Sequence, residues 1–177
     1  VSVGNGRKRP RIDKRILKII FVAGDIFPKG FVPTFDALQN LVESGLKVEL
    51  TVIGKFKEEG YVLKEFSPDP AIWSKNLKNN KWVTHYEQLP NGDVLKKIAE
   101  HDVLISPSYD ETLGWAVIEA GLLGVPSITT NVFALLELVK HNESGYVIDL
   151  KLGRQRRWQG VWEQGDKLNK EITQANE

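Results

Sequence analysis

The sequence ILKIIFVA at residues Ile16–Ala23 indicates the fold class of this chain. The run is apolar at nearly every position and rich in β-branched residues, which is typical of a strand buried on both faces of a parallel sheet. The pair Gly24-Asp25 follows directly and predicts a turn at the end of the strand. From here to Leu150, short apolar runs alternate with segments of helical spacing.

Further strands and helices follow from the spacing of apolar residues. Strands are predicted at Lys47–Ile53, Trp82–Tyr86, Asp102–Ile105, Ser127–Thr130 and Tyr146–Leu150. Helices are predicted at Thr34–Val42, Ala71–Leu77, Leu113–Leu123 and Phe133–Lys140. A further helix is predicted through Ala99, with Asn91 or Asp93 as its capping residue. This alternation predicts an α/β fold, a Rossmann-like parallel sheet with helices on both faces. Ligands of such sheets bind beyond the carboxyl ends of the strands, so the site is expected in the loops there.

Composition places the chain among ordinary soluble domains. It has 177 residues, of which 41% are hydrophobic and 27% charged, and its formal net charge is +1. That charge gives no global field for nucleic acid, so no nucleic-acid partner is expected. The absence of Cys excludes a disulfide framework and a thiolate nucleophile. The chain also lacks Met and begins with Val, which favours a fragment of a longer protein.

Changes in composition predict three segments. Residues 1–15 are polar and basic and are expected to form a leader or linker. Residues 16–150 hold the predicted sheet and form the main domain. Residues 151–177 lose the strand periodicity, and Trp158 and Trp162 have the i, i+4 spacing of a helix. We expect a C-terminal helical tail that packs on a domain surface, with contact to an anionic membrane as the alternative.

Several common catalytic and binding motifs are missing from the sequence. No G-x-G-x-x-G pattern follows a predicted strand, and neither the Walker A pattern nor the G-x-S-x-G pattern occurs. The three histidines, His85, His101 and His141, lie far apart in sequence, and there is no H-E-x-x-H pattern. No metal site is therefore expected.

The segment Ser106–Asn131, SPSYDETLGWAVIEAGLLGVPSITTN, carries the densest chemistry. Glu111 follows the predicted fourth strand, Thr112-Leu113-Gly114 opens the next helix, and Glu119 lies about a turn and a half further on. A helix start offers free N–H groups and a partial positive charge, which suit a phosphate. Carboxylates on either side of it can accept hydrogen bonds from vicinal hydroxyls. A phosphate between two sets of hydroxyls describes a nucleotide-sugar.

This segment resembles the family 4 glycosyltransferases of the GT-B fold. Glu111 and Glu119 form an E-x7-E motif within a string similar to that family's P-S-x-x-E-x-x-G…E-A-x-x-x-G-x-P. The other matching positions are Pro107, Ser108, Gly114, Ala120, Gly124 and Pro126. Upstream, Phe21–Gly24 and Lys29-Gly30 resemble the family's first strand and its K-G loop. The resemblance covers residues 16–150, the predicted nucleotide-sugar-binding domain.

The resemblance implies a role for each matching residue. Glu111 and Lys29 would be catalytic, because Glu111 would face the transferred sugar and Lys29 would neutralise the departing diphosphate. Glu119 would bind the ribose hydroxyls, and the N–H groups of Leu113 and Gly114 would hold the diphosphate. The remaining donor-binding residues would be Gly24, Thr112 and, in the base-contacting segment Thr84–Glu87, His85. No metal or other cofactor is implied, since the helix start and cationic side chains stabilise the leaving group.

The resemblance also implies an activity and partners. The chain would be the donor-binding, C-terminal half of a GT-B enzyme that transfers a sugar from a nucleotide-diphosphate donor, such as a UDP- or GDP-sugar, with retention. An N-terminal domain outside this sequence would hold the acceptor, a sugar or glycolipid, so this chain alone is expected to turn over poorly. A cytoplasmic location is expected, with peripheral contact at the inner face of the membrane as an option.

Two positions differ from the family pattern. Asp25 stands where the family has an Arg on the diphosphate, and Phe133-Ala134 replaces a Gly-Gly pair. A negative charge at Asp25 would repel a diphosphate unless it is turned away or paired, and bulk at Phe133 would narrow the sugar pocket. Two alternatives stay open: a non-catalytic nucleotide-sugar-binding domain, and a sugar-nucleotide epimerase of the same fold.

Overall fold

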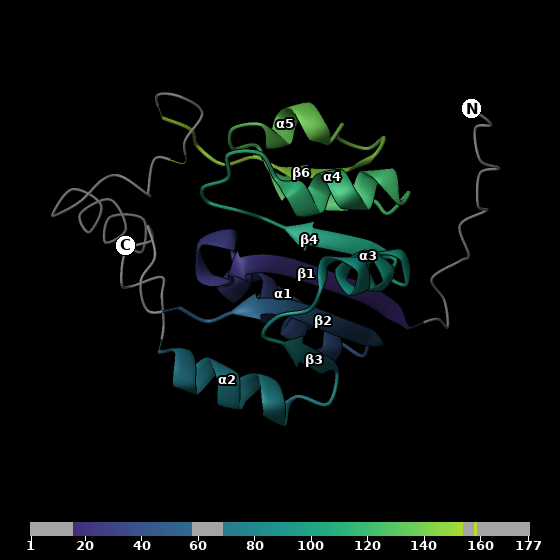
Figure 1. Cartoon of the computed structure of the whole chain (residues 1–177). Helices are drawn as coiled ribbons and strands as arrows, with labels where there is room; N and C mark the ends of the chain where they lie inside the picture. The colour runs from purple at the N-terminus through teal and green to yellow at the C-terminus, as the bar shows by residue number, and fades with distance from the viewer. Residues whose placement is uncertain (1–15, 58–68, 154–157, 159–177) are drawn as a thin grey trace, which may run out of the picture.

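The computed structural model describes residues 16–57, 69–153 and 158. Within these residues, six strands form one sheet in the order β3-β2-β1-β4-β5-β6 (Figure 1). Every pairing between neighbouring strands is parallel. The predicted α/β fold with a parallel sheet is therefore confirmed. Residues 1–15 and most of 151–177 lie outside the described part, so the leader and the helical tail stay predictions.

The strands lie within a few residues of the apolar runs that predict them. Their bounds are β1 Leu17–Asp25, β2 Val48–Lys55, β3 Val83–Tyr86, β4 Val103–Ser106, β5 Ser127–Thr130 and β6 Gly145–Ile148. The predicted turn at Gly24-Asp25 is wrong, because β1 continues through both residues. Asp25 pairs with Lys55 of β2 after a register irregularity that begins at Val22. Such an irregularity lets a strand bend without ending.

The α-helices match the predicted segments, but α1, α4 and α5 start two or three residues away from the predicted positions. Their bounds are η2 (a 3₁₀ turn) Phe27–Lys29, α1 Phe31–Glu43, α2 Pro70–Asn79, α3 Asn91–Ala99, α4 Trp115–Leu122 and α5 Leu135–Leu138. Helix α1 begins earlier than predicted and α4 begins later. Both follow a glycine in the left-handed region, Gly30 with φ 75° and Gly114 with φ 78°, and neither has a side-chain cap. Sequence signals for helix starts rely on capping side chains, so they miss such starts.

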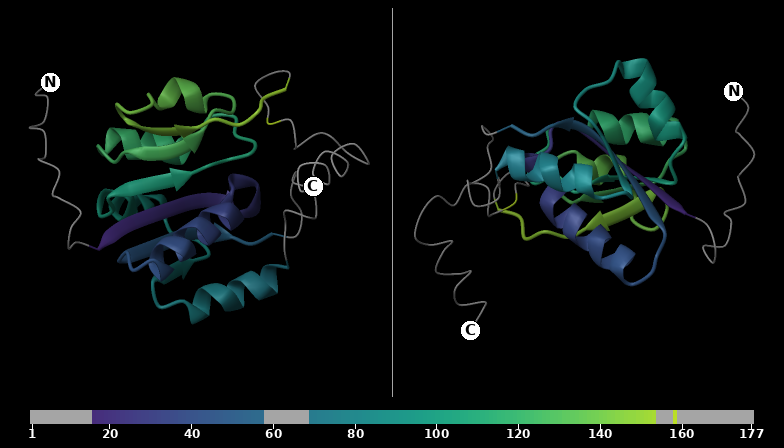
Figure 2. Two further views of the ribbon diagram at one scale, coloured as in Figure 1. Left: turned by 180° about the vertical axis from the view of Figure 1, so that it is seen from behind. Right: turned by 90° about the horizontal axis from the view of Figure 1, so that it is seen from below.

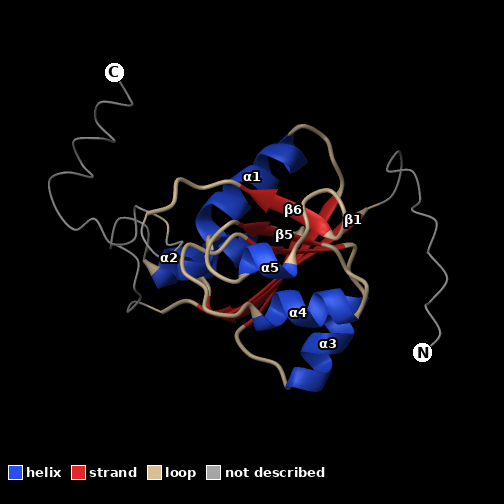
Figure 3. Cartoon of the chain, turned by 90° about the horizontal axis from the view of Figure 1, so that it is seen from above, coloured by secondary structure: helices blue, strands red, loops and turns tan. Residues whose placement is uncertain are grey.

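Helices cover both faces of the sheet, as predicted, with α1 on one face and α3 and α4 on the other (Figures 2 and 3). Two clusters of buried apolar side chains fill the space between the helices and the sheet. The first includes Phe31 of α1 and Trp73 of α2, and the second includes Ile98 of α3, Val117 of α4 and Leu135 of α5. Among the described residues, no helix has the length and apolar character needed to span a bilayer.

Aromatic rings dominate the first cluster. Phe31 is fully buried, and its ring centroid lies 5.2 Å from that of Phe21, 5.6 Å from that of Trp73 and 5.9 Å from that of Phe56. These contacts are T-shaped, the geometry that aromatic quadrupoles favour. Phe31 therefore ties β1, α1 and α2 together at the first residue of its helix.

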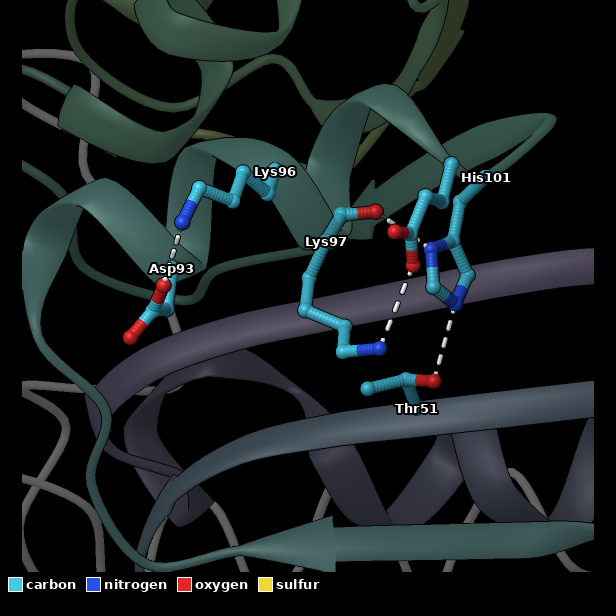
Figure 4. Close-up of polar contacts among 6 residues, drawn as sticks. Thr51, Asp93, Lys96, Lys97 and His101 are labelled. Carbon is cyan, nitrogen blue, oxygen red and sulfur yellow. Dashed lines mark hydrogen bonds and ion pairs between the residues drawn. The ribbon is translucent and has the colours of Figure 1, made fainter.

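A polar link joins the end of α3 to the middle of β2 (Figure 4). Nδ1 of His101 contacts the carbonyl oxygen of Lys97, and Nε2 lies 2.8 Å from the hydroxyl of Thr51. A carbonyl only accepts, so Nδ1 carries the proton and the Thr51 hydroxyl donates to Nε2. Nearby on α3, Lys96 pairs with Asp93 at 2.9 Å. His101 thus has a structural role on the face that α3 covers.

The order of the strands places the binding region. The chain moves outward from β1 to β3, crosses back to β4, and then moves outward in the other direction to β6. The two directions diverge between β1 and β4, whose pairing joins Ile19 to Val103. In open parallel sheets, ligands bind beyond the carboxyl ends of the strands at such a switch point.

Candidate functional site

A cleft of about 750 Å³ lies at that switch point. The ends of β1, β2 and β4, the loops that follow them, and the start of α4 contribute its lining. Five residues predicted for the site line this cleft: Gly24, Lys29, Glu111, Gly114 and Glu119. The fold therefore brings together residues that are far apart in the sequence.

Lys29 and Glu111 form an ion pair in the cleft. Nζ of Lys29 lies 2.9 Å from Oε2 of Glu111 and donates a hydrogen bond of 2.7 Å to the backbone carbonyl of Asp110. The two side chains are only 24% and 17% exposed, so solvent screens this pair less than an ordinary surface pair. The pair joins the loop between β1 and α1 to the loop after β4.

The start of α4 presents free backbone donors to the cleft. The first bonds of the helix run from Val117 and Ile118 to the carbonyl of Gly114, at 2.9 and 3.1 Å. The N–H groups of Trp115 and Ala116 precede these bonds, and both residues line the cleft. A partial positive charge at this helix end favours an anion there.

Thr112 and Leu113 lie in the loop before α4 and are exposed. Neither is among the described residues that line the cleft. The sequence interpretation places donor contacts here because it starts the helix at Leu113. Because Gly114 takes a left-handed conformation, the helix begins at Trp115, two residues later than predicted.

Glu119 is hydrogen-bonded to Asn91, a residue that the sequence interpretation considers as a helix cap. The side-chain amide of Asn91 donates a hydrogen bond of 3.0 Å to Oε1 of Glu119, and both residues line the cleft. The prediction that Asn91 or Asp93 caps α3 is wrong, because the capping position is Pro90 and no side chain caps the helix. The carboxylate of Glu119 has further acceptor sites for hydroxyl groups.

His85 lies beside the cleft without lining it. Its Nε2 donates a hydrogen bond of 2.8 Å to the carbonyl of Gly54, and its ring centroid lies 5.2 Å from that of Phe56. These contacts link β3 to the end of β2. Glu87 and Gln88, which follow β3, do line the cleft. The predicted base-contacting segment therefore reaches the cleft at its last residue.

Asp25 lies at the end of β1, outside the cleft lining. Its Oδ1 atom is buried and has no hydrogen-bond partner among the described residues. Burial raises the pKa of Asp25 above its ordinary value of 3.8. The N–H groups of Phe27 and Lys57 and the cations of Lys57 and Lys29 act in the opposite direction. This carboxyl is therefore flanked by two cations.

Two lysines that the sequence interpretation missed also line the cleft. Lys55 and Lys57 follow Gly54 at the end of β2. Both lysines follow the predicted strand Lys47–Ile53, whose carboxyl end lies at the expected binding edge of the sheet. Their position could therefore have identified them as candidate site residues. Among the described residues, the cleft has three lysines and three glutamates: Lys29, Lys55, Lys57, Glu87, Glu111 and Glu119.

Phe133 adopts a backbone conformation that suits glycine. Its φ is 43°, in the left-handed region, which is costly for a bulky residue. Its side chain packs against the second apolar cluster and is not among the described residues that line the cleft. The expected narrowing of a sugar pocket by Phe133 is therefore not seen in the described cleft.

The polar groups of the cleft are lysines, carboxylates, amides and backbone N–H groups. Such groups can bind phosphates and hydroxyls directly. In the described part of the chain, no group of three or more His, Asp or Glu side chains could hold a metal ion.

Comparison with known proteins finds glycosyltransferases among the relatives of this chain. The family model for "Glycosyl transferases group 1" matches residues 5–154. The chain is 26% identical over 129 residues to the capsular polysaccharide biosynthesis glycosyltransferase CapM of Staphylococcus aureus, covering 73% of this chain and 32% of CapM. It is 25% identical over 138 residues to glycogen synthase of Mycobacterium tuberculosis, covering 78% of this chain and 31% of that enzyme. The chain thus spans about a third of the length of these relatives.

Solved structures share the fold at low sequence identity. Anabaena Alr3699/HepE, solved in complex with UDP-glucose, aligns with a TM-score of 0.58 and 18% identity over 76% of this chain and 35% of HepE. WaaG, a glycosyltransferase involved in lipopolysaccharide biosynthesis, aligns with a TM-score of 0.57 and 22% identity over 93% of this chain and 40% of WaaG. The family match confirms the predicted resemblance to glycosyltransferases. The assignment to family 4 stays a prediction. With the family match spanning most of its length, the chain belongs to the group 1 glycosyl transferases.

Proposed function

We propose that this chain is the C-terminal, donor-binding domain of a GT-B glycosyltransferase of family 4. The whole protein would transfer a sugar from a nucleotide-diphosphate donor to an acceptor held by an N-terminal domain, with retention at the anomeric carbon. The observation that carries the proposal is the cleft that gathers Lys29, Glu111, the start of α4 and Glu119. The complex of HepE with UDP-glucose supports a nucleotide-sugar as the ligand.

The diphosphate would bind at the start of α4. The N–H groups of Gly114, Trp115 and Ala116 would donate to phosphate oxygens there. Lys29 would neutralise the charge that develops as the sugar leaves, since its Nζ is already held at the cleft by Asp110. Lys57 adds a second cation at the same edge. With these groups, we expect the leaving group to be stabilised without a metal ion.

The two glutamates would bind the two sugar units of the donor. Glu119 would accept hydrogen bonds from the ribose hydroxyls, and Asn91 orients its carboxylate from one side. Glu111 would face the transferred sugar, next to Lys29 at 2.9 Å. The base would lie near Glu87, at the end of the segment that follows β3.

Titration of the chain with UDP, GDP and ADP tests donor binding. We expect saturable binding, with backbone amide shifts in nuclear magnetic resonance (NMR) spectra concentrated at Lys29, Gly114–Ala116 and Glu119. The absence of binding to all three nucleotides at millimolar concentration would contradict the proposal.

Replacement of Glu119 tests the ribose contact. We expect Glu119→Ala to weaken nucleoside diphosphate binding about 10- to 150-fold, because a charge-assisted hydrogen bond is worth about 1.5–3 kcal/mol. Isothermal calorimetry measures this change, and circular dichroism checks that the domain remains folded. Glu143→Ala is the control, since Glu143 is exposed and pairs with Lys140 away from the cleft. Unchanged affinity in Glu119→Ala would refute the ribose role.

A non-catalytic donor-binding domain is the second candidate. The buried, flanked carboxyl of Asp25 favours it, because the family pattern has an Arg there. Incubation of the whole protein with donor and candidate acceptors separates the two functions. Transfer of the sugar supports the enzyme, whereas donor binding with neither transfer nor hydrolysis supports the second candidate.

A further inference from the structure

Trp158 contacts the loop that carries Glu111. It pairs with Leu152 in an isolated antiparallel bridge. The ring of Trp158 stacks on that of Tyr109, with centroids 4.7 Å apart and an interplanar angle of 27°. Trp158 also packs against the second apolar cluster. The indole therefore lies between the core and the loop that follows β4.

Tyr109 connects this contact to the ion pair of the cleft. Its backbone N–H donates a hydrogen bond of 3.1 Å to the carbonyl of Pro28, the residue before Lys29. The next residue, Asp110, accepts a hydrogen bond from Nζ of Lys29, and Glu111 completes the ion pair. A continuous set of contacts therefore runs from Trp158 to both charged residues.

We infer that Trp158 is a positioning residue: its stacking on Tyr109 holds the loop of residues 107–114 against Lys29 and thereby fixes the Lys29–Glu111 pair for the sugar and diphosphate of the donor. This inference rests on the proposed function. It assigns to Trp158 an effect on the sugar and diphosphate of the donor and none on its ribose. Glu119 and Asn91 belong to α4 and α3 and take no part in this set of contacts.

The physical basis is the way in which this loop is anchored. At its start, the carbonyl of Ser108 accepts a hydrogen bond from the hydroxyl of Thr130, and the Ser108 hydroxyl donates to the carbonyl of Asp110 within the loop at 2.8 Å. Loop residues hold a productive geometry only when packing fixes them, and a displacement of about 1 Å in a binding group is costly. Trp158 supplies packing of this kind through its ring, so we expect aromaticity at residue 158 to be the required property.

Fluorine NMR on the chain labelled with 5-fluorotryptophan tests the contact without any disruptive change. The probes are UDP-glucose, GDP-mannose and ADP-glucose. We expect the Trp158 resonance to shift on binding together with that of Trp115, which lines the cleft. Trp73, buried in the first cluster, is the internal control and should not move.

The outcomes separate this inference from the proposed function. A shift of Trp115 without a shift of Trp158 overturns the inference and leaves donor binding intact. No shift of Trp115 and no heat of binding with any of the three probes overturn the proposed function, and the inference with it.

Two variants then test the positioning effect. We expect Trp158→Ala to weaken binding of the nucleotide-sugar about tenfold, while binding of the matching nucleoside monophosphate stays within about twofold. Trp158→Phe should restore most of the affinity, because it keeps a ring to stack on Tyr109. Equal losses for both ligands, or no loss for either, would overturn the inference. Tyr109→Leu provides a second variant with the same expected pattern.

Discussion

Asp25 is the residue at which the sequence departs most clearly from the family pattern, and its surroundings explain how a carboxyl can stand there. It lies in the last position of β1, with one oxygen buried, and the charges of Lys57 and Lys29 act on it. Burial disfavours its ionised form, while the two cations and the N–H groups of Phe27 and Lys57 favour that form. The net direction is a raised pKa.

Replacement of Asp25 by Asn should stabilise the domain at neutral pH. The folded carboxyl has a pKa above 3.8, so the unfolded chain loses this proton at lower pH than the folded domain does. Ionisation of Asp25 therefore lowers the free energy of unfolding as the pH rises above that value. Urea unfolding should show Asp25→Asn to be more stable than the parent at pH 7 and nearly equal to it at pH 3. A gain of equal size at both pH values would contradict this account.

The same variant should bind nucleoside diphosphates more tightly. A unit charge a few ångströms from a phosphate is worth about 1 kcal/mol in a water-like dielectric, which corresponds to about fivefold in affinity. Calorimetry with and without added salt measures the change, and the difference between the variants should shrink at high salt. Weaker binding by Asp25→Asn would show that the carboxyl supports the site.

At the scale of elements, the strands could be predicted, whereas the starts of α1, α4 and α5 could not. Runs such as Ile16–Ala23 are long and apolar, so a strand buried on both faces is the natural interpretation. The starts of α1 and α4 depend on the left-handed conformations of Gly30 and Gly114, which leave no capping side chain to recognise. Glu111 and Glu119 could be predicted as cleft residues from the E-x7-E motif, and Lys29 from its resemblance to the K-G loop. Asn91 could not, because its partner lies on another helix.

Gly114 tests how far the start of α4 depends on its backbone conformation. An added Cβ would meet Cδ2 of Leu135 at 2.8 Å, and φ is 78°. We expect Gly114→Ala to lower the free energy of unfolding by about 1–2 kcal/mol, the cost of a left-handed L-residue. Gly24→Ala is the control and should change stability by less than about 0.5 kcal/mol, because Gly24 lines the same cleft and an added Cβ would meet nothing within 4 Å. Equal effects in urea unfolding would contradict the argument.

The link between α3 and β2 should make stability depend on pH. Burial lowers the pKa of His101 below its ordinary 6.5, Lys18 and Lys97 act in the same direction, and the Lys97 carbonyl and Glu100 oppose them. The unfolded chain therefore takes up this proton at higher pH than the folded domain does. The free energy of unfolding should fall as the pH drops below 6.5. Urea unfolding at pH 7.5 and at pH 5.5 measures this change. Between these two pH values, the free energy of unfolding should change less in His101→Gln than in the parent chain.

At the scale of the whole molecule, two apolar clusters hold the helices to opposite faces of one sheet. Phe31 occupies the centre of the aromatic cluster and is fully buried. We expect Phe31→Ala to lower the free energy of unfolding by about 3–5 kcal/mol, since it leaves a large cavity. Ile72→Ala, on the same side of the sheet and at a residue that is 56% exposed, should change it by less than about 0.5 kcal/mol. Similar losses in urea unfolding would contradict this view of the core.

The strand order also has a consequence for how the domain is made. β1 lies between β2 and β4, and β4 comes from much later in the chain. During synthesis, β1, α1 and β2 can associate early, while the other side of β1 stays an unpaired strand edge with apolar residues such as Ile20. Slow, non-local pairing of this kind exposes a growing chain to aggregation. We therefore expect the nascent amino-terminal half to depend on chaperones until β4 has emerged from the ribosome.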